Sequence, residues 1–411
     1  MKYNTFTLPN GLRIIHLPSA SPVVYCGYGV AAGSRDEKTG EEGLAHFCEH
    51  VSFKGTERRS SRDIIDDIEG VGGDLNAFTN KEDTFFYAAV LKEHTARAVD
   101  VLSDMMFHST FPADELEKEK TVICEEIDSY NDSPAELIFD EFENIVFKGH
   151  PLGHNILGSE DNVRRFTSND AKRFTSRYYR PSNMIFFAYG DIDFNKLINL
   201  VAKDTEEYEN AEPETEKNIT NSSIPSNVTG QIIHSDRDTH QSHILIGTQA
   251  YGIHDARRMP LYVLNNILGG PGMNALLNLK LREQYGLVYT VESSMVSYGD
   301  TGLWCTYLGC DKENKDRCLD LVRQELDKCM KKPLTEKALS AAKKQLKGQI
   351  GIACDNRENF ALDFGKSFLH YGREKDIKTL FSDIDAVQAR QIQQVALQLF
   401  NKDRLTTLIY D

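Results

Sequence analysis

The stretch His46-Phe47-Cys48-Glu49-His50 is the most informative part of this 411-residue chain. In a helix, successive side chains are rotated by about 100°, so His46, Glu49 and His50 share one face while Cys48 points away. Two imidazoles at positions i and i+4 can bind one Zn²⁺ ion, and the carboxylate beside them can reach a water at that ion. The order H-x-x-E-H reverses the commoner H-E-x-x-H motif. The alternative is a helix that carries two histidines by chance. The whole chain has only 12 histidines, which argues against a chance match to this motif.

A catalytic zinc site needs a third protein ligand, with its fourth position left for water. The expected helix Asp114–Asn131 carries several carboxylates, and Glu119 and Glu126 project from one face of it because they are seven residues apart. Val122 and Ile123 are expected between them on the same face. The alternative is an exposed helix whose carboxylates all face water, which is the usual setting of such charge runs. The residues alone leave both interpretations open.

Length and composition indicate a globular protein of about two domains. Hydrophobic residues make up 40% of the chain and charged residues 27%, which is ordinary for such proteins. The net charge of -15 argues against a nucleic-acid partner, because phosphate binding needs a basic surface. The eight cysteines are scattered, with no C-x-x-C pair, and are expected to be reduced thiols that fill gaps in the core.

The sequence gives no sign of export or of a membrane segment. Its first residues contain no basic region followed by an apolar run, so no secretory signal is expected. No window approaches 18 uninterrupted apolar residues, so no segment is expected to span a membrane. These observations predict a cytoplasmic protein with no membrane partner.

The first half of the chain is expected to form strands and helices in one domain. It opens with a hairpin whose turn is Pro9-Asn10-Gly11, between two segments of alternating polarity. A third strand is expected at 23–32, just before the histidine motif. Later helices and strands are expected from periodicity: helices at 61–69, 94–108, 114–131 and 168–178, and strands at 74–79, 84–91 and 184–190.

An acidic, polar segment at 206–228 is expected to be a linker between an N-terminal domain, 1–205, and a C-terminal domain, 229–411. The second domain repeats the order of strands followed by helices. Its strands are expected at 230–234, 243–248, 287–298 and 302–309, and its helices near 259–268, after a glycine-rich break up to 284, at 315–331 and at 335–352. The sequence therefore predicts an α+β fold of two similar α/β-layer domains. Each domain is an antiparallel-rich sheet packed with helices, and the pair forms a pseudo-duplication.

The motif and its surroundings resemble a known family. The histidine motif followed by Val51-Ser52-Phe53-Lys54-Gly55-Thr56 is similar to the active-site signature of the insulinase/pitrilysin, or inverzincin, zinc peptidases, which include the mitochondrial processing peptidase. The resemblance implies that His46, His50 and Glu126 bind one Zn²⁺ per chain, Glu126 lying 76 residues after His50. It also implies that Glu49 is the general base and that Glu119 assists the site without binding the metal. Cys48 departs from the family's larger apolar residue, and a packing role is expected for it, with redox sensing as the alternative.

Two further segments resemble parts of this family that bind substrate. Residues 72–79 are similar to an edge strand beside the zinc, which implies that Asn76, Ala77, Phe78 and Thr79 hold the backbone of a peptide. Residues 282–289 are similar to a segment of the second half, which implies that Arg282 and Tyr289 hold substrate carbonyls near the metal. Without the resemblance, an ordinary hairpin and a chance Arg–Tyr pair would explain these residues equally well.

The resemblance implies a zinc-dependent endopeptidase that hydrolyses peptides or unfolded polypeptide segments in a chamber formed by two subunits. Because both the metal motif and the Arg–Tyr segment lie on one chain, a homodimer is expected. The alternative is a non-catalytic or partner-dependent subunit of a processing-peptidase-like complex. Hydrolysis of a small non-peptide substrate is a further alternative, disfavoured by the edge-strand match.

Overall fold

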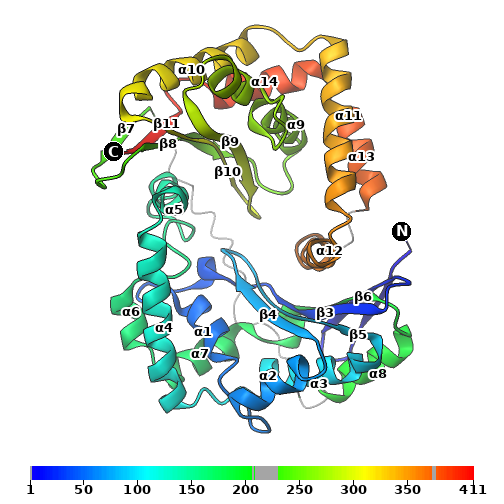
Figure 1. Cartoon of the computed structure of the whole chain (residues 1–411). Helices are drawn as coiled ribbons and strands as arrows, with labels where there is room; N and C mark the ends of the chain where they lie inside the picture. Colours follow the sequence, from blue (N-terminus) through cyan, green and yellow to red (C-terminus); the bar gives the residue numbers. More distant parts are fainter. Residues whose placement is uncertain (1, 206–207, 209–229, 373–375) are drawn as a thin grey trace. The chain divides into compact units, whose positions relative to one another are not determined.

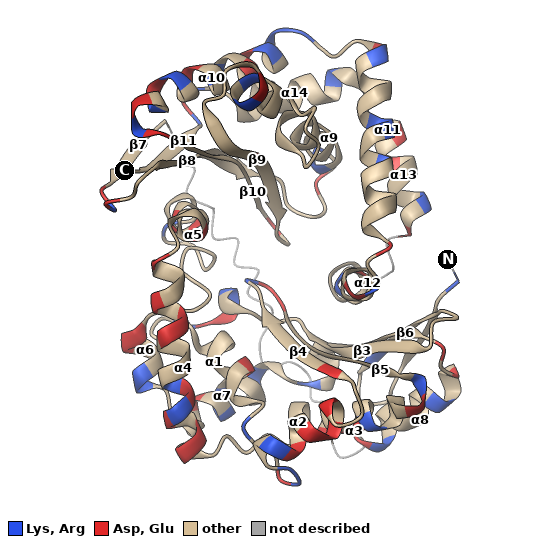
Figure 2. Cartoon of the chain, in the orientation of Figure 1, with Lys and Arg blue, Asp and Glu red and all other residues tan. Residues whose placement is uncertain are grey.

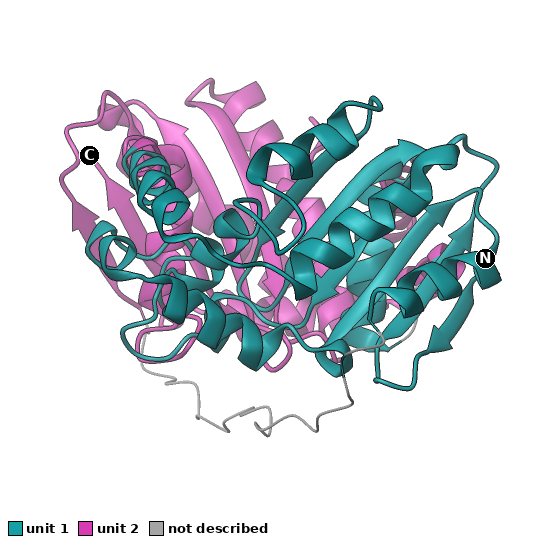
Figure 3. Ribbon diagram, turned by 90° about the horizontal axis from the view of Figure 1, so that it is seen from below, with its two compact units in different colours: residues 1–128, 154–220, 354–376 teal, residues 129–153, 221–353, 377–411 magenta. Residues whose placement is uncertain are grey.

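The computed structural model of the chain describes residues 2–205, 208, 230–372 and 376–411. These residues form two compact units (Figure 3). Unit 1 comprises residues 1–128, 154–220 and 354–376, and unit 2 comprises residues 129–153, 221–353 and 377–411. Each unit is built from non-contiguous segments, whereas the sequence analysis divides the chain at one linker. That linker, 206–228, lies outside the described residues except for Tyr208.

Unit 1 is organised around a six-stranded mixed sheet with the order β1-β2-β6-β3-β5-β4. The pair β2–β6 is parallel, and the other neighbouring strands are antiparallel. The predicted hairpin is confirmed as β1 and β2. Strand β4 pairs only with β5, so its other edge is free of sheet partners among the described residues. The strands are β1 (Asn4–Thr7), β2 (Arg13–Pro18), β3 (Val23–Val30), β4 (Asp74–Thr79), β5 (Thr84–Leu91) and β6 (Met184–Gly190).

Most helices of unit 1 cover one face of this sheet (Figure 1). Alternate residues of β3, such as Val24 and Tyr28, are fully buried against them. Burial of this alternating apolar set is the main force that holds the layers together. The helices that contribute to this core are α1 (Leu44–Val51), α2 (Ser61–Glu69), α3 (Thr95–Phe107), α4 (Ala113–Asn131), α6 (Glu160–Arg165), α7 (Ser168–Tyr178) and α8 (Phe194–Lys203).

The opposite face of the unit 1 sheet is covered by α12 (Arg357–Tyr371), a helix from the C-terminal half of the chain. Phe364 and Phe368 of this helix pack against a second apolar cluster that includes Phe85 and Phe187. The helix contacts β6 and β3. The central strands of the six-stranded sheet are therefore buried on both faces.

Unit 2 repeats this plan with a five-stranded sheet in the order β7-β11-β8-β10-β9. The pair β11–β7 is parallel, and the other pairs are antiparallel. Strand β9 is an edge strand, as β4 is in unit 1. The strands are β7 (Ile232–Ser235), β8 (Ser242–Ala250), β9 (Val288–Ser297), β10 (Gly302–Cys310) and β11 (Thr406–Tyr410).

Helices cover both faces of the unit 2 sheet as well. One face carries a helical layer around the fully buried Trp304, and the other carries a single helix from the N-terminal half of the chain, α5 (Pro134–Val146). Each unit thus takes one covering helix from the other half. The helices of the first layer are α9 (Arg258–Gly269), α10 (Lys315–Lys331), α11 (Glu336–Ala353), α13 (Ile377–Ala386) and α14 (Ala389–Leu399).

The predicted α+β class of two similar units is confirmed. The structure adds elements for which the sequence analysis made no prediction, above all α5 and the segment from α12 to β11. Figure 2 shows that charged residues lie mainly on helices and loops, with acidic residues prominent on α2 and α4, while the strands are mostly uncharged. In the described part of the chain, no helix combines the length and the apolar character needed to cross a membrane.

Candidate metal centre

The histidine motif forms the helix α1 (Leu44–Val51), as predicted. The helix begins after Gly43, whose φ of 97° is a left-handed conformation that favours glycine. Phe47 and Cys48 are fully buried and anchor the helix in the core. His46 and His50 lie one turn apart on the same face, and their ring centroids are 4.5 Å apart. The helix therefore presents two imidazoles side by side.

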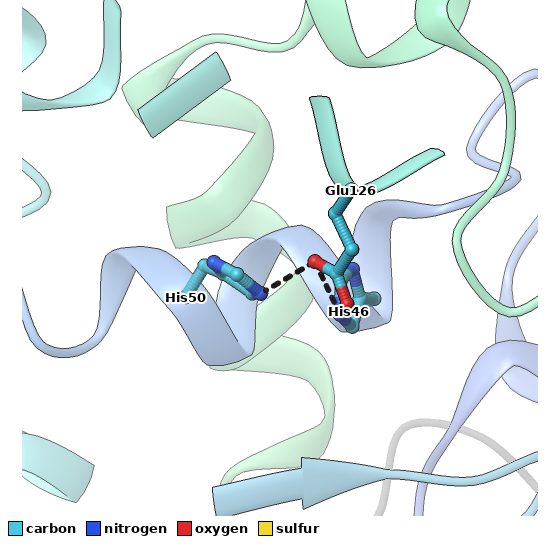
Figure 4. A group of neighbouring side chains, drawn as sticks. All are labelled: His46, His50 and Glu126. Atoms are coloured by element: carbon cyan, nitrogen blue, oxygen red, sulfur yellow. Dashed lines mark ion pairs between the residues drawn. The ribbon is translucent and has the colours of Figure 1, made fainter. Parts of the chain in front are cut away.

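Helix α4 (Ala113–Asn131) supplies the carboxylates of this site. Oε2 of Glu126 lies 3.4 Å from Nε2 of His50 and 3.8 Å from Nε2 of His46 (Figure 4). Between the two glutamates, Ile123 is fully buried, but Val122 is 48% exposed. The expectation that Val122 shares the buried face is therefore wrong, because one residue moves a side chain by about 100° around the helix.

These three side chains fit a small cation. Their ligand atoms all lie within 4.8 Å of one another, and within the described ranges they form the only such group of His, Cys, Asp or Glu residues. A tetrahedral Zn²⁺ ion with ligand bonds of about 2.1 Å requires ligand atoms about 3.4 Å apart. The printed separations of 3.4 and 3.8 Å are close to that spacing. Two imidazole nitrogens and one carboxylate are also a donor set that zinc accepts.

Glu119 lies beside the group and contacts only one of the two imidazoles. Its Oε1 accepts a hydrogen bond from Nδ1 of His50 at 2.8 Å, and its Oε2 lies 2.6 Å from Nζ of Lys54. Glu119 is 6% exposed, so burial works against its charge, but the partners His50 and Lys54 hold its pKa below the usual value. In contrast, Nδ1 of His46 is buried with no hydrogen-bond partner among the described residues.

The surroundings of the two histidines shift their pKa values in opposite directions. Burial lowers the pKa of His46 to about 4, and the neighbouring His50 adds to this effect. Burial also opposes the charge on His50, but the carboxylates of Glu119 and Glu126 outweigh it and raise the pKa of His50 to about 9. The two carboxylates therefore favour positive charge at His50.

Glu49 is 8% exposed and lies on the same helix as the two imidazoles. Burial raises the pKa of its carboxyl group, although a hydrogen bond from Thr79 and the nearby His50 oppose the shift. Oγ1 of Thr79 donates to Oε2 of Glu49 at 2.5 Å. A raised pKa suits a carboxylate that accepts and returns a proton near neutral pH.

The expected substrate strand is β4 (Asp74–Thr79), and its side chains alternate between the two faces of the sheet. Ala77 packs towards the helical layer, where Thr79 also reaches Glu49. Phe78 points to the other face and stacks on Phe85, with ring centroids 5.3 Å apart. Asn76 donates from Nδ2 to the carboxylate of Asp74 at 2.9 Å. The free backbone of this strand, rather than its side chains, is the part available to an added peptide strand.

Arg282 and Tyr289 belong to unit 2, whereas the metal group belongs to unit 1. Arg282 lies in the π-helical segment η4 (Asn278–Gln284), and Tyr289 lies in the edge strand β9 and is 72% exposed. Both residues line a cavity of about 550 Å³ in unit 2, together with Asn265, Asn266, Met273 and Gln349. The two side chains are thus brought together at one cavity.

The structure also identifies contacts that the sequence analysis did not assign. Lys54 stands in the motif region, but its ion pair with Glu119 joins residues 65 positions apart and leaves no local signal. The hydroxyl of Thr79, a residue expected to hold substrate, also donates a hydrogen bond to the carboxylate of Glu49. Cys48 is fully buried, and its Sγ lies 3.9 Å from the carbonyl oxygen of Ala171 in α7. Burial raises the pKa of this thiol, which argues for packing rather than redox sensing.

Comparison with known proteins identifies relatives over nearly the whole chain. Residues 14–160 match the family described as insulinase (peptidase family M16), and residues 165–346 match the one described as the peptidase M16 inactive domain. The uncharacterized zinc protease YmxG of Bacillus subtilis is 33% identical over 406 residues, which cover 98% of this chain and 97% of that protein. An uncharacterized zinc protease of Streptomyces coelicolor is 32% identical and covers 96% of this chain and 87% of its own length.

Solved structures share the fold. A protease from Helicobacter pylori superimposes with a TM-score of 0.89 at 21% identity, covering 100% of this chain and 99% of its own. A protein from Pseudomonas fluorescens, described as a peptidase M16 inactive domain, also gives a TM-score of 0.89, at 18% identity and with 100% and 98% of the two chains covered. From the family matches and the sequence identity of its relatives, this chain belongs to the insulinase family of peptidases, M16.

Proposed function

We propose that this protein is a zinc-dependent endopeptidase that cleaves peptides or unfolded polypeptide segments. The observation that carries the proposal is the convergence of Nε2 of His46, Nε2 of His50 and Oε2 of Glu126 within 4.8 Å. The names of the relatives, which are called zinc proteases, support zinc as the metal. We assign one Zn²⁺ per chain to these three ligands.

A zinc ion bound there would polarise the scissile carbonyl and make a neighbouring water more acidic. The chain's own contribution is proton transfer by Glu49. Its Oε2 is held by Thr79, so Oε1 is the atom that accepts the proton of the attacking water and delivers it to the leaving amine. The buried position of Glu49 favours the first of these transfers, because a carboxylate with a raised pKa is a stronger base and accepts a proton more readily.

The substrate is held as an added strand. Strand β4 has a free edge whose N–H and C=O groups can pair with an extended peptide. Peptides and unfolded segments can readily adopt an extended backbone along their whole length, which is the reason for proposing that substrate class. Glu49 contacts the last residue of this strand, Thr79, so a peptide on β4 lies next to the base.

Arg282 and Tyr289 are proposed to hold substrate carbonyls and to stabilise the negative charge that develops during attack. A guanidinium and a phenol both donate hydrogen bonds, and both residues line a cavity of unit 2. The proposal includes a homodimer that encloses the substrate, because one chain carries both the metal group and the Arg–Tyr pair. Light scattering during turnover tests this part, and a protein that is active as a monomer contradicts it.

The decisive experiment combines metal analysis with cleavage of a quenched fluorescent peptide library. The wild-type protein is expected to bind one equivalent of zinc, to lose activity to a chelator and to regain it when zinc is added. Glu49→Gln is expected to bind zinc without cleaving. A protein that binds zinc but cleaves only after addition of a second, related chain would support the alternative of a partner-dependent subunit. Cleavage of simple esters but not of peptides would refute the peptidase.

A further inference from the structure

We propose that Lys54 is a positioning residue of the metal centre, which acts through Glu119 to hold His50 as a ligand. The inference rests on the proposed zinc site and adds to it a residue that is not one of the three ligands. The proposal is based on two consecutive side-chain contacts in unit 1. Nζ of Lys54 lies 2.6 Å from Oε2 of Glu119, and Oε1 of Glu119 lies 2.8 Å from Nδ1 of His50.

The backbone holds Lys54 in a defined place just beyond the end of α1. Its N–H donates to the carbonyl of Val51 at 3.1 Å, which continues the last turn of the helix. Gly55 follows with a φ of 144°, a conformation that disfavours other residues. The carbonyl of Gly55 then accepts a hydrogen bond from the N–H of Thr110 at 3.1 Å. The lysine is thereby fixed between the helix that carries His50 and the segment that leads into α4.

The two oxygens of Glu119 have different donors, and this division sets the orientation of the carboxylate. The side chain of Glu119 is 8% exposed, and that of Lys54 is 23% exposed, so little water is available to replace either contact. With Oε2 held by the ammonium group, Oε1 faces the ring of His50. If the ammonium group were absent, the carboxylate could rotate and the buried charge would lack its cationic partner.

The consequence for His50 is a defined tautomer. A carboxylate that accepts from Nδ1 keeps the proton on that nitrogen and leaves the lone pair of Nε2 for a metal. Nε2 is the atom that faces Glu126, at 3.4 Å. His46 has no such support, because its Nδ1 is unpartnered among the described residues. Lys54 and Glu119 thus support the orientation of His50 rather than that of His46.

The test is the zinc affinity of Lys54→Met, measured by competition with a chromophoric chelator. Methionine keeps much of the length of lysine and removes the charge. Zinc affinity is expected to fall about tenfold or more, because loss of such outer contacts typically weakens a site by about 10–100-fold. At saturating zinc, kcat is expected to fall several-fold while KM stays within about twofold of wild type. Lys54→Arg restores the cation and should recover most of the lost affinity.

A matched control is Lys118→Met, which removes the same charge from an ion pair on α4. Lys118 lies 2.5 Å from Glu115, and its side chain is 68% exposed, so its loss should leave zinc affinity and kcat unchanged. If Lys54→Met does not fold, Lys54→Gln replaces it, with the same expected loss of affinity.

Zinc affinity within twofold of wild type in a folded, uncharged Lys54 variant would overturn the inference, even if thermal stability drops. An affinity loss in Lys118→Met as large as that in Lys54→Met would overturn it as well. Failure of the proposed function looks different: a wild-type protein that binds zinc but cleaves no peptide refutes the peptidase and leaves the affinity comparison valid.

Discussion

Oγ1 of Thr79 donates a hydrogen bond to Oε2 of Glu49 at 2.5 Å. This contact joins the last residue of the edge strand β4 to the carboxylate proposed as the general base. The contact holds Oε2 of this carboxylate, and Oε1 is the oxygen proposed to accept the proton of the reacting water. The strand that is proposed to hold the substrate therefore also contacts the proposed base.

Replacing Thr79 with valine should lower kcat about tenfold without loss of zinc. Valine has the shape of threonine but cannot donate to Glu49, and a hydrogen bond to a charged group contributes about 1.5–3 kcal/mol. The carboxylate would then adopt several orientations, only some of which can reach the water. Steady-state kinetics on a quenched peptide, with zinc content measured in parallel, checks this expectation. Thr79→Ser keeps the hydroxyl and should stay near wild type; equal losses in the two variants would show that the methyl group matters instead.

Glu49→Gln should abolish hydrolysis while one equivalent of zinc remains bound. The amide keeps the size of the side chain and an oxygen for Thr79, but it cannot accept the proton of the attacking water. General-base catalysis typically contributes about 10²–10⁴-fold, so kcat should fall within that range. Metal analysis of the purified variant separates loss of the base from loss of the metal. Wild-type cleavage by this variant with zinc in excess would rule out Glu49 as the base.

Glu126→Ala should lose zinc, whereas Glu125→Ala should keep it. The carboxylate of Glu126 lies close to both imidazoles, whereas Glu125 is about 100° away on the same helix. Affinity for zinc is expected to fall by at least about 100-fold in Glu126→Ala, beyond the usual effect of losing an outer contact. Chelator competition on both variants measures the difference. Similar affinities for the two would mean that another residue completes the site.

The parts of the site that depend on local periodicity could be predicted from the sequence. The spacing of His46, Glu49 and His50 sets their common face whatever the surrounding fold, because it depends only on helix geometry. The contact of Glu126 with those histidines joins two helices, and it was predicted from the family resemblance rather than from periodicity. The ion pair of Lys54 was missed, because a contact between a turn and a distant helix has no sequence period.

The main limit of the fold prediction concerns which helix covers which sheet. The apolar residues of α12 indicate a buried face, but a helical period does not say which distant strands that face meets. The helix packs on unit 1, although most of its neighbours in sequence belong to unit 2. Dividing the chain at one linker could not predict that α12 belongs to unit 1 or that α5 belongs to unit 2.

Asp83 anchors α12 to unit 1 through a buried carboxylate. Its Oδ2 lies 2.7 Å from Nε2 of His370 and 3.2 Å from Nζ of Lys366, both on α12. Asn80 donates to Oδ1 at 2.6 Å. Asp83 is 2% exposed, and burial alone would raise its pKa, but the hydrogen bond from His370 and the charge of Lys366 outweigh burial and hold the pKa below the usual value.

The attachment of α12 should therefore weaken in acid. Because the pKa of Asp83 is lower in the folded protein, its contribution is fully present above the unfolded value of about 3.9 and is lost as the pH falls through the folded value. At pH 7, Asp83→Asn should destabilise the docked helix by about 1.5–3 kcal/mol, because the buried carboxylate is lost as the charged partner of His370 and of the partly exposed Lys366. Hydrogen exchange of peptides within Arg357–Tyr371 should be faster in this variant than in wild type at pH 7, with the difference shrinking as the pH is lowered below 4.

Asp191→Asn, which breaks an exposed pair with Lys92, is the control and should not change exchange in α12. Equal protection of α12 in wild type and Asp83→Asn at pH 7 would show that apolar packing alone holds the helix.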